Sequence, residues 1–137
     1  MSTALYHEAL VAKARSGAGK GRLAHATVSA RLDNPLCGDR VTLDLHLQDG
    51  RIDAVGHEVK GCLLCEAAAA SIAELAVGQT PDEARALAGG ITAMMKEGAA
   101  SPLPALDIYT PVQTAKSRRD CVLLPFGALT KALSGLS

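Results

Sequence analysis

Four cysteines and one aspartate are the residues of this 137-residue chain whose types and spacing could do chemistry. They are Cys37, Asp39, Cys62, Cys65 and Cys121. Three thiolates and one carboxylate suit a tetrahedral zinc ion or an iron–sulfur cluster. A thiolate at a helix start is also a sulfur nucleophile. The sequence therefore indicates metal chemistry, sulfur chemistry or both, provided that the fold brings these residues together.

The segments around these residues predict three consecutive strands followed by helices. Residues 26–32 and 41–48 alternate apolar and polar side chains, as half-buried strands do. The third strand, 51–59, alternates less cleanly, and Gly56 suggests a bulge in it. Asp49-Gly50 is a strong tight-turn signal. Helices are predicted at about 3–15, 62–77, 81–87, 91–96 and 123–134, with a flexible glycine-rich connection at 17–22 and a long surface loop at 98–119.

An antiparallel meander of these strands would gather the cysteines. Cys37 lies in the connection between the first two strands, and Cys62 directly follows the third strand. Both residues therefore lie at the end of the sheet opposite the Asp49-Gly50 turn. Cys62 also opens a helix, whose free N–H groups favour a thiolate. Cys121, predicted to open the last helix, could dock beside them if that helix packs across the sheet.

Composition restricts the function classes. Lys and Arg together number 14, and Asp and Glu together also number 14, so the chain lacks the basic excess of a nucleic-acid-binding domain. Aromatic residues make up only 2%, which leaves few side chains on which bases could stack. No apolar run reaches the roughly 18 residues of a membrane span, and no secretory signal is recognisable. We therefore expect a single cytoplasmic domain, 1–137, without disulfides in its reducing compartment. Residues 1–22 form its N-terminal helix and connection.

The order of three cysteine motifs resembles a known family. These motifs are Asn34-Pro35-Leu36-Cys37-Gly38-Asp39, then Gly61-Cys62, and finally Cys121. It is similar to the IscU/SufU/NifU N-terminal family of iron–sulfur cluster assembly scaffolds, over about Leu32 to Leu133. The long spacing between the last two cysteines, with its stretch ITAMMKEG, resembles the SufU branch.

The resemblance implies a fold, a ligand set and partners. The fold is α+β, with a three-stranded antiparallel sheet and helices packed on one face. The family's ligands for a transient Fe–S cluster, or for zinc, match Cys37, Asp39, Cys62 and Cys121. Among these residues, we expect Cys37 to accept persulfide sulfur. The implied partners are a cysteine desulfurase and apo iron–sulfur acceptor proteins. Such a protein is a scaffold or a zinc-dependent sulfur acceptor rather than a conventional enzyme.

The chain departs from the family pattern at four places. Cys65 stands where serine is common, and Asp120 stands where the IscU branch has histidine. The chaperone-recognition segment LPPVK of that branch is absent before Cys121. Pro125 falls inside the family's last helix, so we expect this helix to start later here.

Other interpretations of the same residues remain open. Cys62 and Cys65 form a CxxC pair at a helix start, which suggests a thiol oxidoreductase. Cys65 could instead reach a bound metal from position i+3, or pack beneath the sheet as a small apolar residue. Arg118 could steer an anionic sulfur intermediate or an acidic partner toward Cys121. The alternative function is a zinc-stabilised structural or protein-interaction domain without sulfur transfer.

Overall fold

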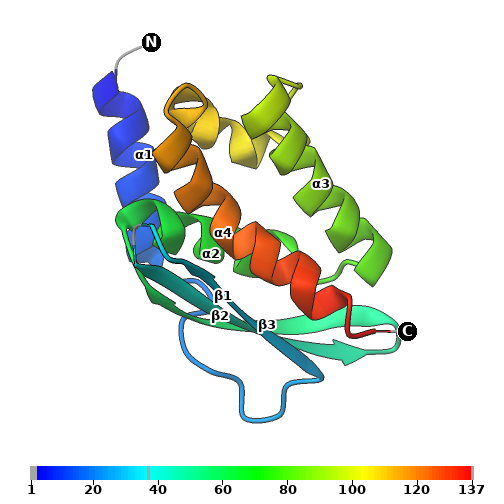
Figure 1. Cartoon of the computed structure of the whole chain (residues 1–137). Coiled ribbons are helices and arrows are strands. Elements are labelled where there is room, and N and C mark those ends of the chain that lie inside the picture. The colour runs from blue at the N-terminus through cyan, green and yellow to red at the C-terminus, as the bar shows by residue number, and fades with distance from the viewer. Residues whose placement is uncertain (1–2, 37, 137) are drawn as a thin grey trace.

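The computed structural model describes residues 3–36 and 38–136. Its sheet has three antiparallel strands in the order β1 (Val28–Asn34), β2 (Asp39–Gln48) and β3 (Arg51–Lys60). The helices all lie over one face of this sheet (Figure 1). The predicted α+β class and the antiparallel meander are confirmed.

The register of the sheet determines which residues meet at its end. Asn34 pairs with Asp39, and Arg40 pairs with Lys60. At the opposite end, Asp49 and Gly50 have φ values of 54° and 76°, the left-handed conformation that a type I′ hairpin requires at both central positions. The segment that leaves β3 toward the next helix therefore starts beside the first residues of β2.

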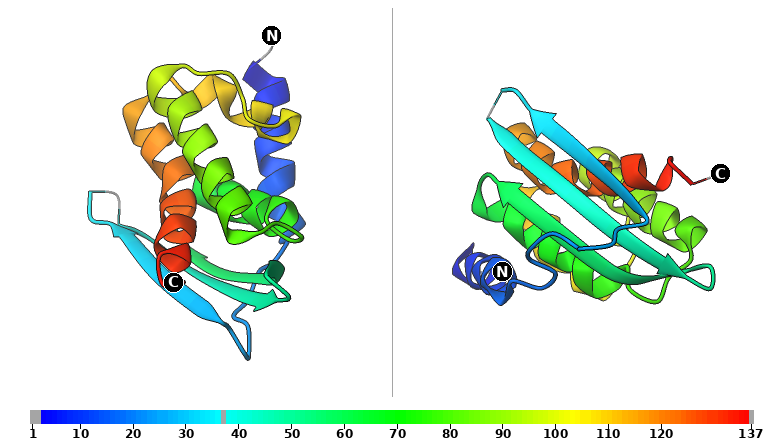
Figure 2. Two further views of the ribbon diagram at one scale, coloured as in Figure 1. Left: turned by 90° about the vertical axis from the view of Figure 1, so that its right-hand side faces the viewer. Right: turned by 90° about the horizontal axis from the view of Figure 1, so that it is seen from below.

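Two helices contact the sheet and two more cover them. The helices α2 (Leu63–Leu75) and α4 (Lys116–Leu133) pack on the strands, while α1 (Thr3–Ser16) packs on α2 and α3 (Pro81–Glu97) packs on α4. Figure 2 shows this layering and the opposite face of the sheet, which no helix covers. The core lies between the layers and includes fully buried residues of β2 and α2: Val41, Leu43, Leu45, Ala67, Ala68 and Ala69. Within the described ranges, no helix is both long and apolar enough to cross a membrane.

The segment 17–22, predicted as a flexible connection, lies along the edge of β3. The Gly21 N–H donates to the His57 carbonyl at 2.8 Å. A Cβ at Gly56 would come within 2.6 Å of the Gly21 carbonyl oxygen, so glycine permits this close approach. The bulge expected at Gly56 is wrong: this residue is paired in register, and the register shift follows His46. The segment thus covers an otherwise open strand edge.

The helix α3 is continuous where two helices were expected. It runs through Gly89 and Gly90, which were predicted to end it. A Cβ at Gly90 would lie 2.8 Å from the Cβ of Pro102, so the lack of a side chain lets the following chain pack against the helix. Its start is as predicted, because Thr80 and Glu83 form a capping box.

The segment 98–119 is not the surface loop that we expected. It contains a 3₁₀ helix, η1 (Pro104–Val112), whose buried side chains are spaced three residues apart: Leu106, Tyr109 and Val112. The last helix starts at Lys116 rather than near residue 123. Cys121 therefore lies inside α4, in its second turn, and does not open the helix.

Candidate metal centre

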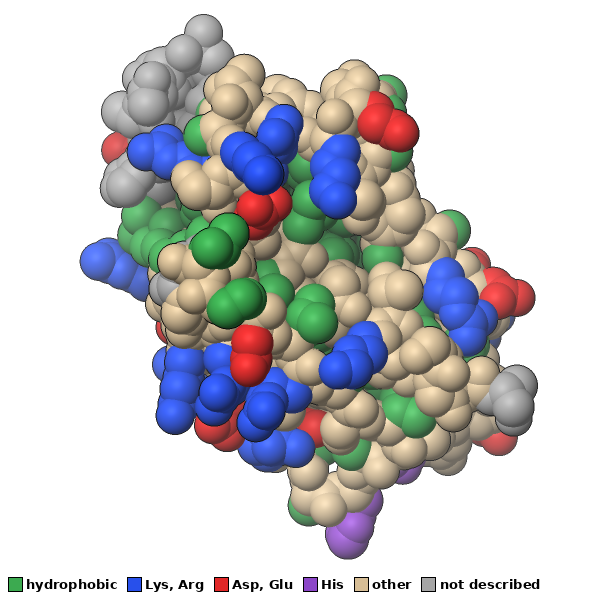
Figure 3. Space-filling model, viewed as in Figure 1, with side chains coloured by type: hydrophobic (Ala, Val, Ile, Leu, Met, Phe, Trp, Pro, Cys, Tyr) green, Lys and Arg blue, Asp and Glu red, His purple; other side chains and the backbone are tan. Residues whose placement is uncertain are grey.

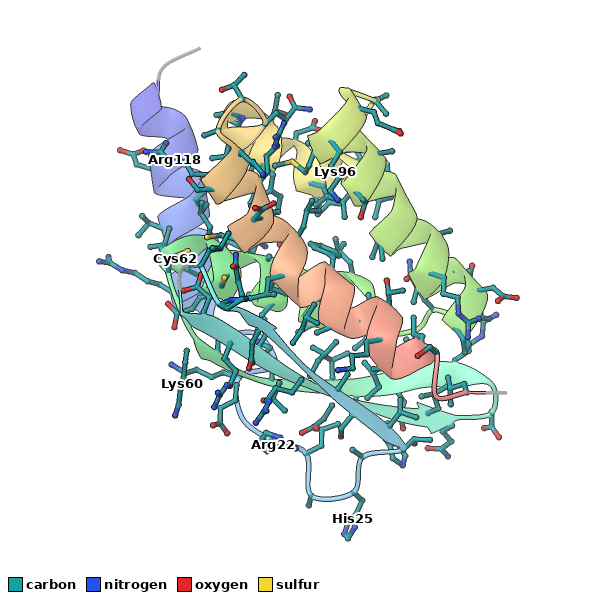
Figure 4. The ribbon with its side chains drawn as sticks, in the orientation of Figure 1. Arg22, His25, Lys60, Cys62, Lys96 and Arg118 are labelled. Carbon is teal, nitrogen blue, oxygen red and sulfur yellow. The ribbon has the colours of Figure 1, made fainter. Side chains whose placement is uncertain are left out.

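Three elements supply the candidate ligands at one end of the sheet. Asp39 is the first residue of β2, and Cys62 is the N-cap residue of α2, two residues after the end of β3. Cys65 lies in the first turn of α2, and Cys121 lies in the second turn of α4. Figure 4 shows Cys62 where β3 gives way to α2, near Lys60.

These side chains form one compact group. One ligand atom from each of Asp39, Cys62, Cys65 and Cys121 lies within 4.8 Å of all the others. The Asp39 Oδ2 accepts hydrogen bonds from the Cys65 Sγ at 3.2 Å and from the Cys121 Sγ at 3.4 Å. The predicted meeting of Asp39, Cys62 and Cys121 is therefore present in the structure. Cys37 lies outside the described residues, so its membership of the site stays a prediction.

The Asp39 carboxylate is held where water hardly reaches it. Its exposed fraction is 7%. A Cβ at Gly61 would lie 2.9 Å from the Asp39 Cγ, so glycine at this position makes room for the carboxyl group. Burying a carboxylate is costly unless it is hydrogen bonded or bound to a cation, which makes Asp39 a suitable oxygen ligand.

The sequence left the role of Cys65 open, and the structure places it within the group. Its side chain is fully buried, so it also fits the expectation of a residue packed beneath the sheet. One sequence signal could have placed Cys65 in the ligand group. It lies three residues after Cys62 on a helix, and side chains at this spacing are neighbours. The described residues alone therefore supply four possible ligands.

Pro125 explains a further contact of Cys65. Proline has no N–H, so the carbonyl of Cys121, four residues earlier in α4, loses its usual helical donor. The Cys65 Sγ lies 3.2 Å from this carbonyl and 3.2 Å from the Asp39 Oδ2, so its single S–H donates to one of these acceptors at a time. The two departures from the family pattern, Cys65 and Pro125, thus compensate each other, and α4 continues through the proline.

The electrostatics of the group favour one thiolate, at Cys62. Hydrogen bonds from the Cys65 side chain, from the backbone N–H groups of Cys65 and Leu64, and from Cys121 together lower the pKa of Cys62 to about 5, although partial burial opposes the shift. Cys62 is also exposed. It is therefore a nucleophile at neutral pH when no metal is bound.

The other two described thiols keep their protons. Donation to the Cys62 thiolate, with burial next, raises the pKa of Cys65. Burial is the main cause of the raised pKa of Cys121, followed by its hydrogen bond to Cys62. A metal ion would have to displace these protons, so metal binding at this site releases protons and strengthens as pH rises.

The donor set fits a tetrahedral ion. Zinc–sulfur bonds of about 2.3 Å place two ligating sulfur atoms about 3.8 Å apart, which is within the span of this group. Sulfur-rich ligands are those that iron–sulfur clusters and zinc use. A zinc ion or cluster would be held from three different elements by Cys62, Cys121 and Asp39. Cys65 would be a further ligand or a hydrogen-bond donor to the ligands.

An open groove with basic residues adjoins the site. It has a volume of about 360 Å³ and includes Asp39, Arg40 and Lys60 in its wall. Figure 3 shows Lys and Arg side chains gathered at this end of the sheet. Arg40 pairs with Asp33 of the same wall at 3.1 Å, so the groove contains both signs of charge, and Lys60 is the cation that would attract anionic sulfur species or an acidic partner.

Arg118 occupies a different position from the groove. It is exposed in the first turn of α4 and is outside the compact group. Figure 4 shows it apart from Cys62, near the start of α4. The structure therefore gives it no contact with a ligand, and steering by its charge remains a prediction.

The chain is similar to a known family and to named proteins over most of its length. Residues 5–135 match the model of the family described as NifU-like N terminal domain. A protein of Thermotoga maritima named iron–sulfur cluster assembly scaffold protein IscU is 28% identical, over 97% of this chain and 95% of its own length. A protein of the same name from Streptococcus pyogenes is 27% identical, over 77% of this chain and 68% of its own length.

Solved structures agree with these sequence relationships. The N-terminal part of a NifU-like protein from Brucella abortus superposes with a TM-score of 0.88 and 29% identity, covering 96% of each chain. A scaffold protein for the SUF system from Fervidobacterium islandicum gives a TM-score of 0.84 with 26% identity, covering 96% of this chain and 99% of its own. The recognised resemblance is confirmed at the level of the family, and the SufU branch remains a prediction.

Proposed function

Because this chain belongs to the NifU-like N-terminal domain family, we propose that it is a scaffold for iron–sulfur cluster assembly. Its curated relatives are named as such scaffolds. The observation that carries the proposal is the convergence of three cysteine sulfurs and a buried carboxylate within 4.8 Å at one end of the sheet. The ligands of the transient cluster are Cys37, Asp39, Cys62 and Cys121.

A mixed ligand set suits a cluster that must leave again. Thiolates bind iron tightly, whereas a single carboxylate is a harder and more easily replaced ligand. The exposure of Cys62 and the groove beside Asp39 leave one side of the site open to an acceptor protein. Apo iron–sulfur proteins are the partners that this geometry would serve.

Sulfur reaches the site as a persulfide from a cysteine desulfurase, and Cys37 accepts it. Its neighbour Leu36 is 92% exposed, so the connection between β1 and β2 is accessible to a large partner. With zinc in place of iron, the same ligands would make the protein a zinc-dependent sulfur acceptor. Lys60 in this groove, and Arg118 farther away, would attract an acidic partner surface.

Anaerobic reconstitution tests the scaffold function. The protein is mixed with ferrous iron and inorganic sulfide, and bound iron, bound sulfide and the visible absorption are measured. We expect a cluster that passes to an apo ferredoxin, and we expect its loss in Cys121→Ser. Cys65→Ser is the matched control, because it removes a thiol from the same group but no proposed ligand. Failure of the wild-type protein to bind iron and sulfide together would contradict the proposal.

Sulfur acceptance has its own test. We expect Cys37→Ser to fold normally by circular dichroism but to take no sulfur from a cysteine desulfurase, because serine is a poor nucleophile at neutral pH. Transferred sulfur is measured by mass spectrometry of the intact protein. If Cys37→Ser still carries a persulfide while Cys121→Ser does not, the acceptor is Cys121.

A zinc-stabilised structural domain is the second candidate, since the group joins β2, α2 and α4. A structural ion would be required for folding. Against this, hydrogen bonds among Asp39, Cys65 and Cys121 already connect the three elements. We therefore expect chelation to leave the helical circular dichroism signal unchanged, whereas a structural zinc site predicts unfolding.

A further inference from the structure

A scaffold that accepts persulfide sulfur faces a redox problem. The outer sulfur of a persulfide is two electrons more oxidised than the sulfide that a cluster contains. Some group must supply two electrons at the place where sulfide is needed. This inference rests on the proposed function, and it concerns two thiols whose joint chemistry the ligand set does not use.

Cys62 and Cys65 have the arrangement of a reactive dithiol. Cys62 is the exposed N-cap residue of α2, and Cys65 follows it three positions later, fully buried. Their sulfur atoms lie within 4.8 Å of each other. Residues at this spacing on a helix are neighbours, and a modest side-chain rotation would bring the sulfurs to the bonding distance of about 2.05 Å.

A buried carboxylate is placed to accept the proton of the inner thiol. The Cys65 Sγ donates to the Asp39 Oδ2 at 3.2 Å, and Asp39 is 7% exposed. This hydrogen bond holds the Cys65 thiol beside the carboxylate, so that the proton can leave as the sulfur attacks. The second contact of Cys65, to the Cys121 carbonyl, involves only an acceptor and cannot take the proton.

We propose that Cys62 and Cys65 act as an internal dithiol that reduces persulfide sulfur to sulfide within the scaffold. The Cys62 thiolate first attacks the outer sulfur of a persulfide that the scaffold has already accepted. That sulfur becomes the outer sulfur of a persulfide on Cys62, and the donor thiolate is freed. The Cys65 Sγ then attacks the Cys62 Sγ, while Asp39 takes the Cys65 proton. The bond to the outer sulfur breaks, and hydrosulfide leaves.

Atoms and electrons balance in this second step. One persulfide and one thiol give one disulfide and one hydrogen sulfide. The outer sulfur gains the two electrons that the sulfurs of Cys62 and Cys65 lose. A dithiol reductant must reopen the Cys62–Cys65 disulfide before the next cycle. Sulfide is thereby released beside the proposed ligands Asp39 and Cys121, where iron would capture it.

The test loads metal-free protein with sulfur in the absence of any reductant. The probe is an inorganic polysulfide, removed by gel filtration under argon. Released sulfide is trapped and quantified, and the tryptic peptide 61–85, which contains both thiols, is analysed by mass spectrometry after alkylation. We expect about one sulfide per chain. The peptide should have two hydrogens fewer than the dithiol form and should resist alkylation.

Matched variants distinguish Cys65 from its neighbours. Cys65→Ser and Cys65→Ala should keep the added sulfur on Cys62 and release sulfide at least about tenfold more slowly. Asp39→Asn keeps both nucleophiles but should also slow release. Thr80→Ala changes a residue outside the group and should release sulfide normally. Circular dichroism verifies that each variant is folded.

Three results would overturn the inference. Sulfide release by Cys65→Ser at the wild-type rate would exclude Cys65 as the resolving thiol. Retention of sulfur by the wild-type protein until dithiothreitol is added would exclude an internal reductant. Absence of added sulfur on Cys62 in Cys65→Ser would exclude the first step. None of these three results bears on cluster reconstitution with iron and inorganic sulfide. Reconstitution therefore tests the scaffold function independently of the dithiol.

Discussion

The helices α2 and α3 begin in opposite ways. At the start of α3, the Glu83 N–H donates to the Thr80 Oγ1 at 3.2 Å, and the Thr80 N–H donates to the Glu83 Oε1 at 2.9 Å. At the start of α2, the N-cap residue is Cys62, whose side chain has no oxygen to accept the usual capping hydrogen bond. A capping box satisfies N–H groups that would otherwise lack partners, and cysteine is not among the residues preferred at this position.

The difference shows what each helix start contributes. The capped start of α3 contributes to stability. At α2 the N–H groups of Leu64 and Cys65 instead stabilise negative charge on the Cys62 sulfur. A weaker cap is thus the structural cost of keeping a thiolate at the end of the sheet, beside Asp39.

The largest effect expected from this comparison is the loss of metal binding in Cys62→Ser. Serine is a good N-cap residue but a poor ligand for iron or zinc. We expect metal affinity to fall by more than about 100-fold, since loss of a direct ligand exceeds the usual effect of an outer-shell change. Chemical denaturation near pH 5, where the Cys62 thiolate contributes little stability, should show equal or higher stability of the metal-free variant. Unchanged affinity would remove Cys62 from the ligand set.

The pH dependence of alkylation tests the thiolate itself. With a pKa of about 5, Cys62 in the metal-free protein should react with iodoacetamide with a midpoint near that pH, whereas an ordinary cysteine has a pKa of 9.0. Cys121 should stay unreactive at neutral pH because its pKa is raised. Peptide mapping after a short pulse measures both rates. A midpoint near the ordinary value would refute the charge stabilisation at α2.

The same shift predicts how stability changes with pH. The pKa of Cys62 is lower in the folded protein than in the unfolded chain, so its contribution is fully present above about pH 9 and is lost as pH falls toward about 5. Wild-type stability minus that of Cys62→Ser, measured without metal, should therefore rise with pH across this window. A flat difference would mean that the folded and unfolded pKa values are equal.

Removing the cap of α3 should act on stability alone. Thr80→Ala should lower the free energy of unfolding by about 1 kcal/mol. Its metal affinity should equal that of the wild-type protein, because Thr80 is outside the group of possible ligands. Urea denaturation and metal titration measure the two effects. A parallel loss of metal binding would show that the α3 start also supports the site.

The smallest effect is expected for Cys65→Ser in metal binding. The serine hydroxyl keeps a donor toward Asp39 and the Cys121 carbonyl, so affinity should change by no more than about threefold. This variant should nevertheless fail to release sulfide from a persulfide. A loss of metal as severe as that of Cys62→Ser would instead identify Cys65 as a ligand.

The sheet and the position of Cys62 were predictable because they follow from local signals. Alternating side chains and the Asp49-Gly50 turn indicate the meander, and its topology places the residue after β3 at the end opposite that turn. The capping box of α3 is equally local. Such features need no knowledge of distant contacts.

The parts that the sequence did not predict depend on distant partners. Gly89 and Gly90 are tolerated within α3 because Pro102 packs against the second glycine. Pro125 is tolerated in α4 because Cys65, which is distant in sequence, donates to the carbonyl that the proline leaves free. Proline and glycine are strong local signals of helix ends, and only tertiary contacts override them.

X-ray absorption spectroscopy of the zinc-loaded protein tests the ligand set most directly. The account predicts a first shell of sulfur atoms at about 2.3 Å together with one oxygen. One sulfur should be lost in Cys62→Ser and none in Cys65→Ser. A shell without sulfur, or one that Cys62→Ser leaves unchanged, would contradict the assignment of the metal centre to this end of the sheet.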